Sequence, residues 1–267
     1  MRAPTVPHAL STQHPGHVLR VATYNIHKGV RGVGPRKRLE IHNLALGVEA
    51  LDADLVFLQE VRFLNRAEAR KFPDTLIGWP RVPQADYLAP DGYEVAYRTN
   101  ATTTHGEHGN ALLSRWPLGD IGHHDVSDHR FEQRGLLHVP VHWNGELVHA
   151  IVAHFGLMHA SRVRQVERLA TFIAASVPKH EALIVAGDFN DWGAKLDAPM
   201  RGLGLRRAVV AGDPPARFNT FPSRLPVFSM DRIYLRGLSC LSTSVPRGAA
   251  WARMSDHLPL IAELTLA

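Results

Sequence analysis

Seven apolar segments of strand length recur along the chain and constrain its fold more than any other feature. They occupy residues 18–26, 54–61, 135–143, 146–155, 182–189, 231–235 and 257–266. The dipeptide Asn144-Gly145 separates two of them and favours a two-residue hairpin turn. We therefore expect sheets in which at least this pair of strands runs antiparallel.

Two further segments have the periodicity of amphipathic helices. Residues 38–51 and residues 161–178 each place apolar side chains on one face, and the second segment opens on Ser161 as a candidate N-cap and stops before Pro178. Each helix precedes a continuously apolar strand, which suggests sheets covered by helices on one side and by a second sheet on the other. The pattern predicts an α/β sandwich of two mixed sheets between helical layers.

The chain of 267 residues shows no repeat, low-complexity segment or long linker, so we predict one domain over residues 18–267. Residues 1–17 contain three prolines and no apolar run, and are predicted to be a flexible N-terminal tail. Residues 64–110 are rich in proline and glycine and are predicted to be largely loop with short elements, the kind of surface where substrate selection often lies.

Composition excludes several classes of protein. The single cysteine, Cys240, excludes an internal disulfide framework and a cysteine-rich zinc site. No segment approaches the roughly 20 apolar residues of a membrane-spanning helix. The N-terminal stretch also has no apolar run of signal-peptide length, so we expect a soluble, cytoplasmic protein. The net charge of +5 mildly favours anionic partners, and residues 31–38, the densest basic stretch, are predicted to be a solvated loop.

Three of the most apolar strands end in carboxylate or amide side chains. Asn25 and Glu60 end two of them, and Asp188 and Asn190 end a third. Neighbouring strand ends would bring these groups to one rim, where acids repel one another unless a cation lies between them. Oxygen ligands of this kind suit Mg²⁺ or Mn²⁺ better than zinc, so the strand ends predict a site for a hard divalent cation, with Glu60 as a direct ligand.

The C-terminal part adds two acids and an imidazole, in Asp231 and in the pair Asp256-His257. An aspartate that accepts the imidazole N–H fixes its tautomer and orients the other ring nitrogen. Such a histidine beside a hard cation fits hydrolysis, and phosphoester cleavage in particular, where positioning and charge neutralisation supply most of the catalysis.

An ordered set of short motifs resembles the endonuclease/exonuclease/phosphatase superfamily. The motifs are TYN at 23–25, LQE at 58–60, HGNALLSR at 108–115, AHF at 153–155, GDFN at 187–190, MDRIY at 230–234 and SDH at 255–257. The resemblance covers nearly the whole chain from about residue 19. It implies a four-layer α/β/β/α sandwich with one active site at an edge.

The resemblance also implies roles around a divalent metal. Asn25 and Glu60 would hold Mg²⁺ or Mn²⁺, with Glu60 as the main ligand, and Asp256 would stand near the metal. Asp188 would align or deprotonate the attacking water, and Asn190 would donate to the phosphoryl oxygens.

The remaining implied roles concern proton transfer and the phosphate pocket. Asp231 would orient His257, which would act as a base or as a phosphate contact, and His154 would protonate the leaving oxygen. Asn110 would help to frame the phosphate pocket. Arg134 begins an apolar strand, where it could reach a phosphate or end the strand as a solvated side chain.

Other arginines have predictions of their own. Arg232 follows Asp231 where many relatives carry an aromatic residue, and it is predicted either to alter the pocket wall or to solvate an edge. Arg162, Arg164 and Arg168 are expected on the solvated face of their helix.

The substrate stays open between two classes of phosphoester. Positive charge favours a nuclease acting on nucleic acid. The residues from 92 to 120, together with His154, look more like the sphingomyelinase branch, which favours a phospholipid headgroup or a small phosphoester. The absence of a signal peptide and of an obvious aromatic membrane finger argues against a secreted sphingomyelinase. A non-catalytic binding module would lack one of the expected acids or histidines, and none is missing.

Overall fold

Alternation of side chains along the strands builds the protein from two sheets packed face to face. The computed structural model describes residues 17–32, 34–73, 77–129, 132–212 and 217–267. Within these residues, one six-stranded sheet has the order β13 (Leu238–Ser244), β14 (Leu260–Leu266), β1 (Leu19–Asn25), β4 (Leu55–Asn65), β6 (Gly106–Ser114) and β5 (Glu94–Thr103).

The second sheet lies against the first and also has six strands in the described part of the chain. Its order is β11 (Arg206–Arg207), β12 (Asp231–Arg236), β10 (Ala182–Asp188), β9 (Glu146–His154), β8 (Gly135–Trp143) and β7 (Gly122–Asp125). Each sheet contains one parallel pair, β1 with β4 and β9 with β10, beside antiparallel pairs. Both sheets are therefore mixed, as predicted.

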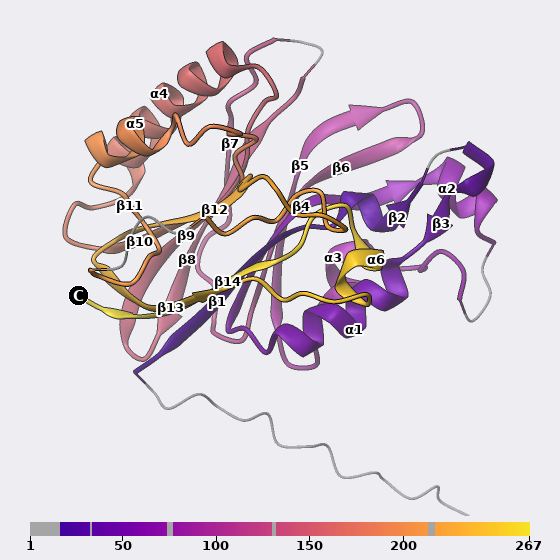
Figure 1. Cartoon of the computed structure of the whole chain (residues 1–267), viewed down its shortest axis with the longest axis horizontal. Helices are drawn as coiled ribbons and strands as arrows, with labels where there is room; N and C mark the ends of the chain where they lie inside the picture. Colours follow the sequence, from indigo (N-terminus) through magenta and orange to yellow (C-terminus); the bar gives the residue numbers. More distant parts are fainter. Residues whose placement is uncertain (1–16, 33, 74–76, 130–131, 213–216) are drawn as a thin grey trace, which may run out of the picture.

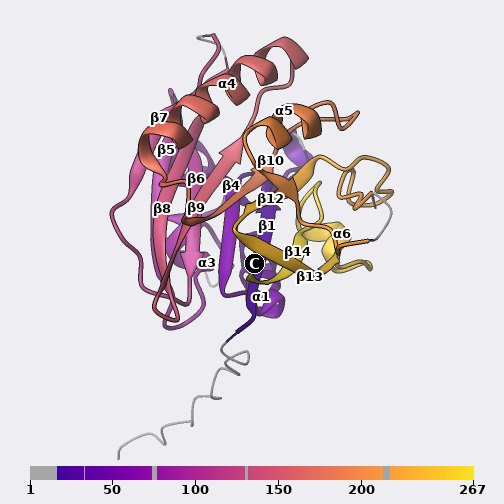
Figure 2. The same cartoon turned by 90° about the vertical axis from the view of Figure 1, so that its left-hand side faces the viewer.

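Helices cover the two outer faces (Figures 1 and 2). On the first sheet lie α1 (Ile41–Leu51), α3 (Gln84–Leu88) and α6 (Trp251–Met254), and on the second lie α4 (His159–Ser176) and α5 (Asp197–Gly202). One apolar cluster fills the space between the sheets, and one lies under each helical layer. The predicted four-layer α/β/β/α sandwich is confirmed.

The predicted hairpin is also confirmed. Asn144 and Gly145 both have positive φ, 51° and 87°, and Trp143 pairs with Glu146 across the turn. Positive φ at both central residues is the geometry that Asn-Gly favours, and it matches the twist of the two strands.

Helix boundaries differ from the prediction by two or three residues. The first helix begins at Ile41, because Arg38–Leu39 form β3 and pair with β2 (Val30–Arg31) in a small hairpin. The short helix η1 (His27–Gly29) precedes this hairpin, and η2 (Gly34–Arg36) lies in the connection between its two strands. The basic stretch is thus not merely a solvated loop. The second helix begins at His159 with Met158 as its N-cap, and Ser161 instead donates to Asp128 Oδ2.

The prediction that residues 64–110 are largely loop is wrong. This region holds the end of β4, the helices α2 (Arg66–Lys71) and α3, all of β5 and the first half of β6. Its strands escaped recognition because β5 is an edge strand with few buried side chains and β6 begins with polar residues. β13, a second edge strand rich in serine, was not predicted either, for the same reason.

Two arginine predictions are also wrong. Arg162 does not face solvent: it is 5% exposed, and its guanidinium donates to the carbonyls of Gly156 and Leu157 in the loop before α4. Arg232 is 1% exposed and points to the outer face of the second sheet, where it pairs with Asp191 at 2.7 Å. It neither alters the pocket wall nor solvates an edge.

Among the described helices, none combines the length and the apolar character that a membrane crossing requires. The predicted tail falls almost wholly on residues 1–16, which lie outside the described residues, so it stays a prediction.

Candidate active site

Three predicted catalytic residues form one row across the second sheet. Asp188 pairs with His154 on β9 and with Asp231 on β12, in register on either side. Along β10 the even-numbered residues Ile184 and Ala186 pack between the sheets, so Asp188 has the same parity and points into the space between them. Because paired strands lie about 4.8 Å apart, the register alone brings the three side chains together.

The first sheet contributes Asn25 from the end of β1 and Glu60 from the middle of β4, the adjacent parallel strand. Strict alternation would turn Glu60 outward with Leu58, but the pairing of β4 with β6 shifts register between Leu58 and Val61. Glu60 has φ of 58° at this bulge. A bulge re-aims a side chain and often lies beside an active site, and here it accounts for a carboxylate that turns toward Asn25 and Lys28.

Asp188 lies at the centre of the cluster. Its Oδ2 accepts a hydrogen bond from Asn25 Nδ2 at 3.1 Å and lies 3.7 Å from His154 Nε2 and 3.6 Å from His257 Nε2. Burial raises the pKa of Asp188 above its usual range, although His257 opposes this effect. Burial, together with the charge of Arg134, lowers the pKa of His154 to about 4.

His257 is held by an aspartate, as predicted for an oriented imidazole. Its Nδ1 lies 2.8 Å from Asp231 Oδ2, which also accepts a hydrogen bond from Thr220 Oγ1. Burial would lower the pKa of His257, but the carboxylates of Asp231 and Asp188 outweigh burial and raise it to about 10. The ring of Phe221 lies against the imidazole, with centroids 4.9 Å apart.

Two basic residues of η1 contact the predicted metal ligands. Lys28 Nζ lies 2.9 Å from Glu60 Oε2, and His27 Nδ1 lies 3.2 Å from Asp256 Oδ2. Burial would raise the pKa of Glu60, but Lys28 and His154 hold it well below its usual range. Glu60 is therefore an ionised, half-buried carboxylate beside Asn25 and Lys28.

The two remaining amides are partly engaged by backbone groups. Asn190 Nδ2 donates to Phe155 O at 2.9 Å, which leaves one of its two amide hydrogens free of that bond. Asn110 is fully buried between the sheets, and its Nδ2 donates to Gly135 O and to Val152 O. Its amide hydrogens thus tie β6 to β8 and β9, and its Oδ1 is buried without a hydrogen-bond partner.

Arg134 lies beside the cluster rather than within it. Its guanidinium donates to Phe155 O at 3.2 Å and to Glu132 Oε1 at 3.3 Å, and only 15% of the side chain is exposed. It is neither a solvated strand end nor aimed freely at a ligand, but its charge reaches His154.

The donor set fits a hard divalent cation. Asp188, Asp231 and His257 each offer a ligand atom, and these atoms lie within 4.8 Å of one another. Asp231 Oδ1 is buried without a hydrogen-bond partner, and a cation or its bound water would satisfy this oxygen. With the ionised Glu60 close by, the site is rich in the oxygen ligands that Mg²⁺ and Mn²⁺ prefer.

Sequence reasoning missed Lys28, His27 and Thr220. The first two lie within three residues of the TYN motif, and both have positive φ, 61° and 45°, a backbone conformation that residues other than glycine rarely adopt. Thr220 lies 11 residues before Asp231, and no periodic signal marks it. Only the fold brings its hydroxyl to the carboxylate.

Comparison with known proteins gives close relatives and similar folds. YbhP from Escherichia coli (strain K12) is 35% identical over 252 residues, which are 92% of this chain and 96% of that protein. Sphingomyelinase C from Leptospira interrogans is 30% identical over 108 residues, 35% of this chain and 19% of that protein.

Solved structures share the architecture. An endonuclease/exonuclease/phosphatase from Beutenbergia cavernae matches with a TM-score of 0.72 at 20% identity, over 94% of this chain and 72% of that one. D. rerio TDP2 complexed with single strand DNA product matches with a TM-score of 0.65 at 17% identity, over 93% of this chain and 99% of that one. The sequence profile of the Endonuclease/Exonuclease/phosphatase family matches residues 22–257, so the chain belongs to this family of phosphoester hydrolases.

Proposed function

We propose that this protein is a Mg²⁺- or Mn²⁺-dependent phosphodiesterase that cleaves nucleic acid by attack of water on phosphorus. The observation that carries the proposal is the meeting of Asp188 with His154 and His257 beside the ionised Glu60. Acids, imidazoles and amides that converge in one buried cluster are the groups that in-line phosphoryl transfer requires.

The proposed metal ligands are Glu60 and Asn25, with Asp256 close by. We prefer them to the set of Asp188, Asp231 and His257, because His257 Nδ1 and Asp231 Oδ2 already contact one another at 2.8 Å. The bound cation would neutralise negative charge on the phosphoryl oxygens. Asn25 Oδ1 accepts one hydrogen bond, from the His27 N–H at 3.0 Å, and an amide oxygen retains a second lone pair for this purpose.

The proton transfers fall to residues of the second sheet. Asp188 aligns the attacking water and accepts its proton, while the P–O bond to the leaving oxygen breaks and His154 delivers a proton to that oxygen. The negative charge of the bound phosphate would raise the pKa of His154, so that the ring can carry this proton. His257, fixed by Asp231, contacts the phosphoryl group, and the free amide hydrogen of Asn190 donates to it. Arg134 supplies positive charge from the side.

Nucleic acid is the favoured substrate because the chain is basic and because arginines gather near the site. A second candidate, a phospholipid headgroup, is favoured by apolar side chains around the cluster. Trp192 is 49% exposed two residues after Asn190, and Leu225 and Val227 are 72% and 52% exposed in the segment that contains Phe221. Amphipathic or apolar side chains in such a place suit a substrate at a lipid surface.

The test is a substrate panel with metal removal. The purified protein is treated with EDTA, restored with MgCl₂ or MnCl₂, and offered plasmid DNA, single-stranded oligonucleotide, RNA, phospholipid vesicles and bis-p-nitrophenyl phosphate. We expect metal-dependent cleavage of nucleic acid that Asp188→Asn abolishes. Full activity in EDTA would refute the metal requirement, and cleavage confined to vesicles would replace the substrate class.

A further inference from the structure

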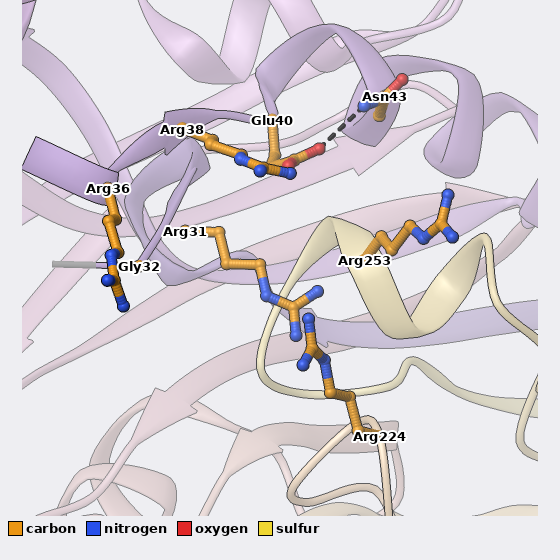
Figure 3. Close-up of a pocket in the computed structure, with 8 residues that line it drawn as sticks. All are labelled: Arg31, Gly32, Arg36, Arg38, Glu40, Asn43, Arg224 and Arg253. Carbon is orange, nitrogen blue, oxygen red and sulfur yellow. Dashed lines mark hydrogen bonds between the residues drawn. The ribbon is translucent and has the colours of Figure 1, made fainter.

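A basic pocket lies beside the active site and has no part in the chemistry described so far. It has a volume of about 630 Å³ and opens to solvent. Among the described residues, its lining comprises Arg31, Gly32, Arg36, Arg38, Glu40, Asn43, Arg224 and Arg253 (Figure 3). Side chains from the β2–β3 hairpin, the start of α1, the segment before β12 and α6 therefore meet around one hollow.

The charges of this pocket are not balanced by its own residues. Five arginines face one carboxylate, Glu40, and that carboxylate accepts a hydrogen bond from Asn43 Nδ2 at 2.7 Å. In Figure 3, Arg31 and Arg224 extend toward one another. Guanidinium groups that converge without acids repel one another unless an anion joins them.

Arginines elsewhere in the fold behave differently. Arg20, Arg115 and Arg232 form ion pairs with Glu263, Asp54 and Asp191 at 2.7, 3.0 and 2.7 Å. Within the described part of the chain, Arg36, Arg38, Arg224 and Arg253 form no ion pair, and all four are exposed. Arg31 is partly structural, since it donates to Ala252 O at 2.5 Å.

The pocket adjoins the active site along two segments of backbone. Arg31 is three residues from Lys28, which contacts Glu60, and Arg224 is three residues from Phe221, which packs on His257. Three residues of chain span at most about 11 Å. Ser223 fixes the second segment, because its N–H donates to Asp256 O and its hydroxyl to Ser255 O, both at 2.7 Å.

We propose that this five-arginine pocket binds a phosphate of the substrate strand that is not being cleaved, one or two nucleotides from the scissile bond. This rests on the proposed function and extends it: the preferred substrate is a nucleic-acid strand that carries several phosphates. Arginine suits the role because its planar fork donates two hydrogen bonds to one phosphate. No exposed apolar side chain lines the described pocket, which favours a strand backbone over a lipid surface.

The first test measures binding without cleavage, so that it does not depend on the catalytic proposal. A fluorescent single-stranded oligonucleotide of about 12 nucleotides is titrated in EDTA at several NaCl concentrations with wild type, Arg224→Gln, Arg36→Gln/Arg224→Gln and the control Arg201→Gln. Arg201 is exposed on α5, outside the pocket. We expect the double variant to weaken binding about tenfold or more, and to reduce the slope of log Kd against log [NaCl] by about 0.7 per lost phosphate contact.

The second test compares substrates. The double variant should lose about tenfold more kcat/KM on the oligonucleotide than on bis-p-nitrophenyl phosphate, which has a single phosphate, and the loss should lie in KM. Equal losses on both substrates, or equal binding by the double variant and Arg201→Gln, would overturn the proposal. So would arginine-dependent binding to phosphatidylglycerol vesicles without binding to the oligonucleotide. If no substrate is cleaved but the binding results hold, the catalytic proposal fails and the pocket stands.

Discussion

His257 Nδ1 lies 2.8 Å from Asp231 Oδ2, and both residues are buried at the junction of the two sheets. The carboxylate leaves Nε2 as the ring nitrogen that faces Asp188. In Asp231→Asn, His257 would lose the carboxylate that keeps its ring protonated and oriented. We expect kcat to fall about a hundred- to ten-thousand-fold while the protein keeps its circular dichroism spectrum. Thr220→Val removes two hydrogen bonds with Asp231 but leaves the carboxylate in place, so kcat should fall far less.

Because Lys28 pairs with Glu60, substitutions of these two residues should change the Mg²⁺ requirement in opposite directions. Glu60→Gln should raise the Mg²⁺ concentration for half-maximal activity about tenfold or more, because a charged ligand is lost. Lys28→Met should lower that concentration, because the ammonium competes with the cation for the same carboxylate. A metal titration of activity measures both. An increase in both variants would mean that Lys28 positions Glu60 rather than competing at it.

His154 is tested by the leaving group. If His154 protonates the leaving oxygen, His154→Ala should slow cleavage of a nucleic-acid diester about a hundred-fold or more. Nitrophenolate leaves without a proton, so the same variant should be less impaired on bis-p-nitrophenyl phosphate. His159→Ala, at the start of α4, is the matched control. A loss of equal size on both substrates would contradict the assignment.

Arg232 and Asp191 form a buried ion pair on the outer face of the second sheet. Arg232→Met would leave Asp191 buried without its cation, and we expect the free energy of unfolding to fall by about 3–5 kcal/mol. Arg164→Met removes an exposed arginine from its pair with Asp128 and should cost far less, because solvent screens an exposed ion pair. Chemical denaturation measures the free energy of unfolding of both variants. Losses of similar size would refute the prediction that the buried pair contributes more.

His138 on β8 predicts a dependence of stability on pH. Burial and the neighbouring His149 lower the pKa of His138 to about 4, below the value of about 6.5 for an unfolded chain. The folded state therefore favours the neutral ring, and its contribution is complete above pH of about 6.5 and lost as pH falls toward about 4. The loss should be about 1–3 kcal/mol and smaller in His138→Gln. His142 is exposed on the same strand, and in His142→Gln the stability should depend on pH as it does in wild type.

Much of the fold was readable because the buried strands carry strong local signals. Continuous apolar runs predicted the central strands, and Asn144-Gly145 predicted a turn that the structure confirms. Edge strands such as β5 and β13 bury little and pack on one neighbour, so their sequences carry no comparable signal. Arg232 was misread because its partner Asp191 is 41 residues away.

The sequence predicted which residues form the candidate site but not how their side chains are oriented. Strand-end acids and amides indicated which residues could meet, and the fold brings Asn25, Glu60 and Asp188 within hydrogen-bonding reach through Asn25 Nδ2. The orientation of Glu60 depends on a bulge between Leu58 and Val61 that only the pairing with β6 specifies. Lys28 and Thr220 meet their partners Glu60 and Asp231 only through tertiary packing, and no periodicity in the sequence predicts these contacts.

His154, Asp188 and Asp231 are aligned across three hydrogen-bonded strands. The proposed chemistry therefore depends on one exact register between these strands. Strands shift past one another only in whole residues, and each step turns every side chain over. One residue inserted in β10 would send Asp188 toward the helices and Phe189 into the space between the sheets. Such an enzyme can be retuned by substitution at fixed positions, but never by sliding a strand a little.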